Sequence, residues 1–308
     1  MVHNRQLAAW VCAACALSFA HTAGKLSWYL AAFIAAGMGL ILLYILYLAP
    51  ANGFATACVT AWGHLPGRIV LLLCAAWTAL MAGFAAALTA EAFPAADGSP
   101  MIPLTVLLLS AWAVHNGVAV GARVSAVLLP FLVSFFVFIV AFGWREVELE
   151  LRQAPAFDLR AVCVILLPLG ASLLPRAEGK TRPLRWIAGL CIAAAALAAT
   201  AAKWGSLYRA VMSISVFGVM ERFEALLCAA MAAGGVCLCT LLGSAGLGLL
   251  KEKRKGAQTF FWALAVIGLA LTNRQNTTVL LVCSLIFWVA IPLVTQWIAK
   301  SKKDEKRC

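Results

Sequence analysis

Residues 28–48 read WYLAAFIAAGMGLILLYILYL, and this stretch contains no charged side chain. A helix crosses the hydrocarbon of a bilayer, about 30 Å thick, when it has roughly 20 consecutive apolar residues. Lipid offers no hydrogen bonds, so the backbone N–H and C=O groups of such a segment must pair within a helix. Residues 28–48 are therefore predicted to form a transmembrane helix.

The same pattern recurs along the chain of 308 residues, of which 64% are hydrophobic and 12% are charged. Its mean hydropathy is +0.95, whereas soluble domains carry about 25% charged residues. The sequence therefore predicts an all-α, polytopic membrane protein that forms one integral membrane domain. We expect ten spans, at residues 7–23, 28–48, 69–90, 101–120, 124–144, 161–174, 186–202, 223–250, 260–271 and 278–299.

The basic residues set the expected orientation, because cytoplasmic loops of membrane proteins are rich in Lys and Arg. If the N-terminus is cytoplasmic, most of the 24 basic residues lie inside. These are Arg5, Arg68, Arg123 and the clusters at 176–185, 251–255 and 300–307. Both termini are therefore expected in the cytoplasm, with 301–308 as a basic tail. If the short sixth span does not cross, the count becomes nine and one terminus changes side.

The net charge of +12 reflects these clusters, which we expect to face anionic membrane lipid and not nucleic acid. Nearly all of the 11 cysteines lie within apolar spans, where Cys behaves as a small hydrophobic residue. No spacing typical of a catalytic or metal site stands out. We therefore expect neither an enzyme nor a cofactor.

Two expected spans contain residues that interrupt a helix. Residues 166–175 read LLPLGASLLP, where Pro168 lacks a backbone donor and Gly170 tolerates non-helical angles. Residues 18–25, at the end of the first span, read SFAHTAGK. This second stretch has two interpretations: a frayed helix end with His21 at the interface, or a discontinuous helix that lines a site for a small solute.

Interrupted helices at matching positions of two halves are the best sequence indication of a transporter site. The first and sixth spans open the two halves that we expect, at residues 1–150 and 156–300. The predicted substrate-binding residues are Ala20, His21, Thr22 and Gly24 from the first span and Pro168, Gly170, Ala171 and Ser172 from the sixth. For the sixth span, a re-entrant segment without a ligand remains the alternative.

Four further sequence motifs follow one another along the chain. They are the opening 4–7 (NRQL), the AGxxxW pattern ending at Trp28, the GxxxxxR pattern from Gly117 to Arg123 followed by Pro130, and residues 208–226 with Tyr208, Glu221, Arg222 and Glu224. Taken together over nearly the whole chain, these motifs resemble the endospore germination permease family, the B subunit of germinant receptors. That family belongs to the amino acid–polyamine–organocation superfamily.

This resemblance implies about ten transmembrane helices in a five-plus-five inverted repeat of the LeuT type, with discontinuous helices 1 and 6. It implies a permease-like subunit in the inner membrane of the dormant spore, with germinant-receptor A and C subunits as partners. Such a subunit would sense a small nutrient, commonly an amino acid, and promote germination.

The chain also departs from the family pattern. Ala119 stands where the family carries Glu in its fourth-span motif, and Ala171 stands where the sixth span normally reads Phe-Gly-Glu. Carboxylates inside a membrane usually hold a ligand amine or a coupling cation, so their loss weakens the case for ion coupling. Two other functions therefore remain open: an amino-acid transporter of vegetative cells, and a degenerate structural partner that binds no solute.

Overall fold

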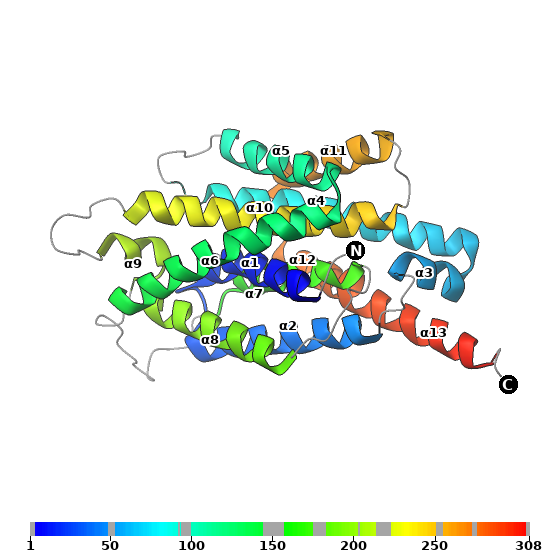
Figure 1. Ribbon diagram of the computed structural model, residues 1–308, viewed down its shortest axis with the longest axis horizontal. Coiled ribbons are helices and arrows are strands. Elements are labelled where there is room, and N and C mark those ends of the chain that lie inside the picture. Colours follow the sequence, from blue (N-terminus) through cyan, green and yellow to red (C-terminus); the bar gives the residue numbers. More distant parts are fainter. Residues whose placement is uncertain are drawn as a thin grey trace.

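The computed structural model describes residues 4–48, 53–91, 93, 100–143, 157–174, 183–202, 204–213, 223–250, 255–272 and 276–305. Every regular element within these ranges is a helix, and most helices run close to the long axis of the molecule (Figure 1). The one extended feature in this part of the chain is an isolated bridge between Ala23 and Leu26. The all-α prediction is confirmed.

The helices have the following bounds. In chain order they are α1 (Asn4–Thr22), α2 (Trp28–Leu48), α3 (Phe54–Trp62), α4 (His64–Ala90), α5 (Met101–His115), α6 (Val118–Gly143), α7 (Leu159–Leu166), the 3-10 helix η3 (Leu167–Leu173), α8 (Pro183–Ala202), α9 (Leu207–Ser213), α10 (Phe223–Leu249), α11 (Lys255–Leu271), α12 (Thr277–Leu285), the π-helical turn η5 (Ile286–Ala290) and α13 (Ile291–Glu305).

Six of the described helices are long and apolar enough to cross a membrane. They are Trp28–Leu46, His64–Ala90, Val118–Gly143, Arg185–Ala202, Glu224–Leu249 and Thr277–Lys302. Three shorter apolar helices accompany them, at Met101–His115, Leu159–Leu173 and Gly256–Leu271. These helices fit a polytopic membrane protein, as the sequence predicted.

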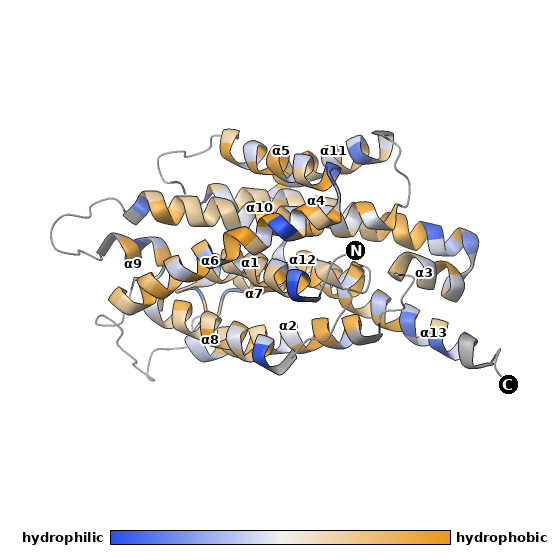
Figure 2. Cartoon of the chain, viewed as in Figure 1, coloured by the Kyte–Doolittle hydropathy of each residue, from blue (hydrophilic) through white to orange (hydrophobic). Residues whose placement is uncertain are grey.

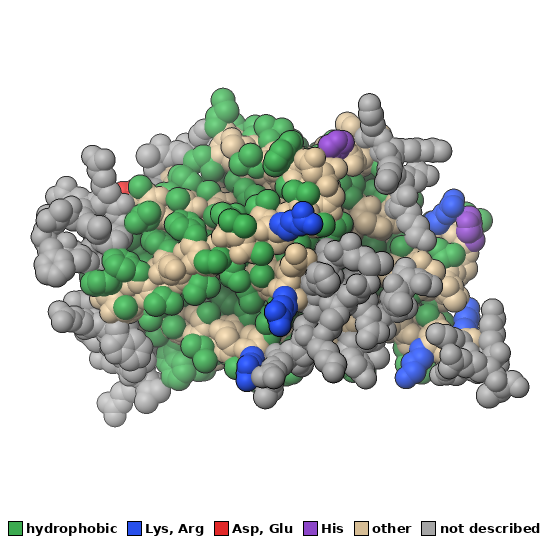
Figure 3. All heavy atoms as spheres, viewed as in Figure 1, with side chains coloured by type: hydrophobic (Ala, Val, Ile, Leu, Met, Phe, Trp, Pro, Cys, Tyr) green, Lys and Arg blue, Asp and Glu red, His purple; other side chains and the backbone are tan. Residues whose placement is uncertain are grey.

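The outer surface of the bundle is suited to lipid. Apolar residues cover most of the length of the helices (Figure 2). On the face seen in Figure 3, hydrophobic side chains dominate and isolated Lys, Arg and His side chains lie among them. Large exposed hydrophobic residues such as Phe33, Val127 and Trp297, each at least 74% exposed, would be unfavourable in water.

Asn116 and Gly117 separate α5 from α6, within a stretch that was predicted to be one helix. Asn116 ends α5, and its side-chain Nδ2 donates to the Trp112 carbonyl at 2.8 Å. Gly117 follows with φ +104°, in the left-handed region that Gly favours after a helix. The expectation of one helix over 101–120 is therefore wrong, and Arg123 lies on α6, exposed, instead of at the end of the fourth span.

Several helices pack along helices that are far from them in the sequence. Helix α2 lies along α8, and α4 lies along both α10 and α11 (Figure 1). Helix α1 packs between α6 and α10 and also contacts α7. Trp10 secures the α1–α10 contact, because its Nε1–H donates to the Cys237 carbonyl at 3.0 Å within the buried core.

Candidate functional site

The sixth span changes helix type at the predicted place. Helix α7 ends at Leu166 and continues as the 3-10 helix η3, whose first turn contains Pro168. Because Pro has no N–H to donate, an α-helical hydrogen bond is lost at this point. The helix changes from α to 3-10 geometry where an interruption was expected, without a break between α7 and η3, and Pro168, Gly170, Ala171 and Ser172 are all buried.

The residues of η3 face the second irregular element, η5. The Ser172 hydroxyl donates to the backbone carbonyl of Trp288 at 2.8 Å, and the Trp288 Nε1–H donates to Thr78 Oγ1 on α4 at 3.4 Å. A Cβ atom on Gly170 would collide with Leu242 of α10 and lie 3.6 Å from the Trp288 ring. Thus η3, η5, α4 and α10 meet around one fully buried indole.

The Ser172 hydrogen bond gives a first testable prediction. In Ser172→Ala the buried Trp288 carbonyl loses a side-chain donor, which should cost about 1 kcal/mol. We expect a thermal unfolding midpoint a few degrees lower for the purified protein in lipid nanodiscs. Ser301→Ala, on the exposed end of α13, is the control, and an equal midpoint for both variants would contradict the assigned bond.

The first span fits one of the two interpretations of residues 18–25 and not the other. Helix α1 is continuous through Ala20, His21 and Thr22 and ends there, so the interpretation as a helix end fits and the prediction of a discontinuous first helix is wrong for these residues. The Thr22 hydroxyl donates to the Ser18 carbonyl at 3.0 Å and does not leave the helix for a ligand. Of the four predicted site residues in the first span, only Gly24, with φ +82°, lies outside the helix, and a Cβ there would lie 2.6 Å from the Gly205 backbone.

The end of α1 carries a cluster of charged groups that sequence reasoning missed as a unit. His21 Nε2 lies 3.3 Å from Glu91 Oε2 and 3.0 Å from Lys25 Nζ. Glu91, just after α4, also accepts a hydrogen bond from Arg160 Nη2 at 2.6 Å. We call His21, Lys25, Glu91 and Arg160 the charged cluster.

Neighbouring groups position the cluster. Asp158 caps the start of α7, because its Oδ1 accepts the Arg160 backbone N–H at 2.8 Å. The Arg160 guanidinium lies 5.9 Å from the centre of the Phe84 ring, within reach of a cation–π attraction. Burial lowers the pKa of Lys25 below its usual value, and the Glu91 carboxylate opposes that effect.

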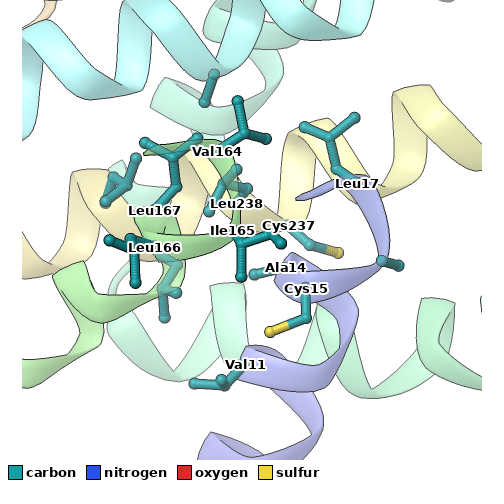
Figure 4. Close-up of a cluster of buried hydrophobic side chains, with 14 of the residues drawn as sticks. Val11, Ala14, Cys15, Leu17, Val164, Ile165, Leu166, Leu167, Cys237 and Leu238 are labelled. Carbon is teal, nitrogen blue, oxygen red and sulfur yellow. The ribbon is translucent and has the colours of Figure 1, made fainter. Parts of the chain in front are cut away.

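The contact between α1 and α7 is apolar where a polar cleft was expected. Val11, Ala14, Cys15 and Leu17 of α1 meet a row of aliphatic residues on α7 and η3, and Cys237 and Leu238 of α10 close the cluster (Figure 4). The aliphatic row consists of Val164, Ile165, Leu166 and Leu167. The described side chains therefore fill the space that a solute between these helices would need.

The predicted site residues thus fall into two places. Gly170 and Ser172 contact α10 and η5, whereas His21 contacts Glu91 and Lys25, and Gly24 lies against Gly205. Within the ranges that the structure describes, no hydrogen bond joins the two sets. Nothing in the sequence spacing of Lys25, Glu91 and Arg160 indicates that these residues come together.

Of the residues that carry the family resemblance, Tyr208 and Trp28 make contacts that the structure describes. Tyr208 on α9 donates its hydroxyl to Glu224 Oε1 on α10 at 2.9 Å, and burial together with this bond raises the pKa of Tyr208. Trp28 starts α2 with its ring edge-on to Tyr29, centres 5.8 Å apart. Glu221 and Arg222 lie outside the described residues.

Comparison of the chain with protein-family models and with curated proteins finds no match. The six long apolar helices place the chain in the class of polytopic helical membrane proteins. Any finer assignment depends on the motifs and on the geometry above.

Proposed function

We propose that the chain is a permease-like subunit of a spore germinant receptor, which senses a small nutrient such as an amino acid and promotes germination. The observation that carries this proposal is the change of helix type at η3, in the sixth span, where the resemblance implies an unwound helix. The motifs at Trp28, at Gly117–Arg123 and at Tyr208–Glu224 supply the link to the family.

The packing pattern supports a five-plus-five inverted repeat. If α7–η3 repeats α1, then α8 repeats α2, α9 repeats α3, α10 repeats α4, α11 repeats α5 and the α12–α13 element repeats α6. The contact of α4 with α11 then corresponds to that of α10 with α5, and the contact of α1 with α6 corresponds to that of α7 with α12. All four contacts occur among the described helices.

The charge distribution supports cytoplasmic termini. The end of the bundle that holds the charged cluster carries Lys25, Arg160 and Arg209 together with Glu91, Asp158 and Glu224 among its described residues, so its charges balance. At the opposite end, Lys302 donates to the Ala61 carbonyl at 2.9 Å, and Arg68 and Lys300 lie on the adjoining helices α4 and α13. An excess of bases is typical of the cytoplasmic side.

The first test is genetic. Deleting the chain should abolish or slow germination with at least one nutrient, while growth of vegetative cells stays normal. Spores are scored against a nutrient panel, and the A and C subunits are sought by co-purification from spore membranes. Normal germination with every nutrient, combined with a defect in amino-acid uptake during growth, would favour the transporter instead.

The second test addresses η3. Ala171→Val adds volume beside the Trp288 contact and should change the response to at least one nutrient, provided that membrane levels of the protein are unchanged. Ala193→Val, on the exposed face of α8, is the matched control. An unchanged response to every nutrient at normal protein levels would remove η3 from the nutrient site.

A structural partner that binds no solute is the second candidate. The apolar contact between α1 and α7 favours it, as does the presence of Ala119 and Ala171 where the family has carboxylates. A ligand that binds the folded state raises the unfolding midpoint. A midpoint raised by one amino acid and not by others would exclude the empty scaffold.

A further inference from the structure

A single nitrogen atom at the end of α1 has two incompatible neighbours. His21 Nε2 lies 3.0 Å from Lys25 Nζ and 3.3 Å from Glu91 Oε2. An imidazole nitrogen either carries a hydrogen and donates, or carries a lone pair and accepts. Lys25 can only donate and an ionised Glu91 can only accept, so Nε2 serves one of them at a time.

The two arrangements differ by one proton or by its position on the ring. When Nε2 has a lone pair, it accepts from Lys25, and Glu91 is held by Arg160 alone at 2.6 Å. When Nε2 carries a hydrogen, it donates to Glu91, and the Lys25 ammonium has to turn away. His21 is 8% exposed and has two cations nearby, which disfavours the imidazolium. The shorter of the two distances, to Lys25, fits the arrangement in which a neutral Nε2 accepts.

We propose that His21 is a proton-binding site, at which uptake of a proton exchanges the His21–Lys25 hydrogen bond for an ion pair between His21 and Glu91. The proton is the ligand, and it enters at Nε2 while Nδ1 keeps its hydrogen. The imidazolium that forms is neutralised by Glu91, and Lys25 moves toward solvent. This site is independent of the nutrient role proposed above.

The charged groups that face the site come from three elements. Lys25 follows α1, Glu91 follows α4, and Arg160 and Asp158 belong to the start of α7. Among the described residues of the link between α8 and α9, the backbone atoms of Gly205 and Ser206, both uncharged, lie against Gly24. Among the described residues, Glu91 is the one carboxylate in contact with the imidazole.

Protonation of His21 would change how the end of α1 contacts its neighbours. Lys25 belongs to the tight turn from Ala23 to Leu26, whose Gly24 lies against the Gly205 backbone. Proton uptake breaks the bond between this turn and His21, and it strengthens the tie between α1 and α4. Acidification would therefore release the Lys25 side chain from α1 and hold α1 to α4, while the Lys25 backbone N–H stays bonded to the Thr22 carbonyl at 3.0 Å. This end of the bundle would then have two states.

The test reads the protonation of the ring directly. The full chain, labelled with ¹⁵N-histidine and reconstituted in lipid nanodiscs, is titrated by NMR, which separates protonated from unprotonated ring nitrogens. His21→Gln identifies the His21 signals. At neutral pH we expect an unprotonated Nε2 and a protonated Nδ1, and a protonated Nε2 at neutral pH would overturn the proposed resting arrangement.

Variants of the two neighbours should move the titration in opposite directions. Lys25→Met removes a like charge and frees the lone pair, so the midpoint of His21 protonation should rise by about one pH unit or more. Glu91→Gln removes the counter-ion, so the midpoint should fall. Lys25→Gln serves as a second variant should Lys25→Met not fold.

Arg209→Met is the matched control, because Arg209 is an exposed cation at the same end of the bundle. Its midpoint should equal that of the wild type. Midpoints that stay unchanged in both Lys25 and Glu91 variants, or that move in the same direction, would overturn the proposal. A residue with a purely structural role at position 21 would not give this opposed pair of shifts.

Discussion

Replacing Gly83 with leucine is expected to separate α4 from α11 and to remove most of the folded protein. A Cβ atom on Gly83 would overlap the Ala265 carbonyl oxygen and lie 2.6 Å from the Leu269 nitrogen. The contact is reciprocal, because a Cβ on Gly268 would lie 2.8 Å from the Leu80 Cα. The obstructing atoms are backbone atoms of a helix, which cannot rotate aside as a side chain does.

The expected cost is large for a single substitution. Overpacking a core usually costs about 1–3 kcal/mol, and here the helices must move apart, so we expect the upper end of that range or more. Helix association in lipid depends on close van der Waals packing, which small residues at the interface allow. The yield of monodisperse protein after extraction, and its unfolding midpoint, measure the effect.

Gly37→Leu is the control, because a Cβ on Gly37 meets nothing within 4 Å. This variant adds the same side chain to α2, at a position that faces no other helix. Equal yield and stability of the two variants would show that α4 and α11 are not packed as described.

The membrane class and the irregular sixth span could be predicted because both depend on local chemistry. A long run without charges, such as 28–48, forms a helix in lipid whatever surrounds it. Pro168 removes a hydrogen bond from its own segment, so its effect is present in the sequence. Helix α7 indeed changes to η3 at this point.

The end of α1 could not be predicted because its outcome depends on distant partners. Residues 18–25 allowed either a helix end or an unwound helix, and the contacts of His21 with Glu91 and Lys25 at the end of α1 are not visible in the sequence. Glu91 and Arg160 lie far along the chain from α1, and no spacing rule links them to His21. The sequence around a loop charge does not show whether that residue is solvated alone or, like Glu91 and Arg160, pairs with a distant residue at the surface.

One boundary was predictable and was missed. Asn116 and Gly117 are a common helix end followed by a left-handed residue, and the structure ends α5 there. Apolar residues on both sides of this pair extended the expected span beyond it. Length of an apolar run is thus a weaker guide to a helix end than the residues that can cap it.

Replacing Trp288 with alanine is expected to produce the largest loss of stability from a single truncation in this part of the bundle. The indole is fully buried, donates to Thr78 Oγ1 at 3.4 Å and lies 3.6 Å from the Cβ position of Gly170. Removing a buried Trp side chain costs about 3–5 kcal/mol, since the surroundings close the cavity only in part.

Trp297→Ala gives the matched comparison, because Trp297 lies on α13 with 74% of its surface exposed. We expect a large fall in the unfolding midpoint in nanodiscs for Trp288→Ala and a small one for Trp297→Ala, with Trp288→Phe between them. The cavity left by Trp288→Ala would lie within the buried hydrophobic core, beside Gly170 and Leu242, and apolar cavities bind small apolar molecules. Benzene should therefore restore part of the midpoint in Trp288→Ala and leave Trp297→Ala unchanged. If both alanine variants lost equal stability, the indole would not fill the junction of η3, η5 and α4.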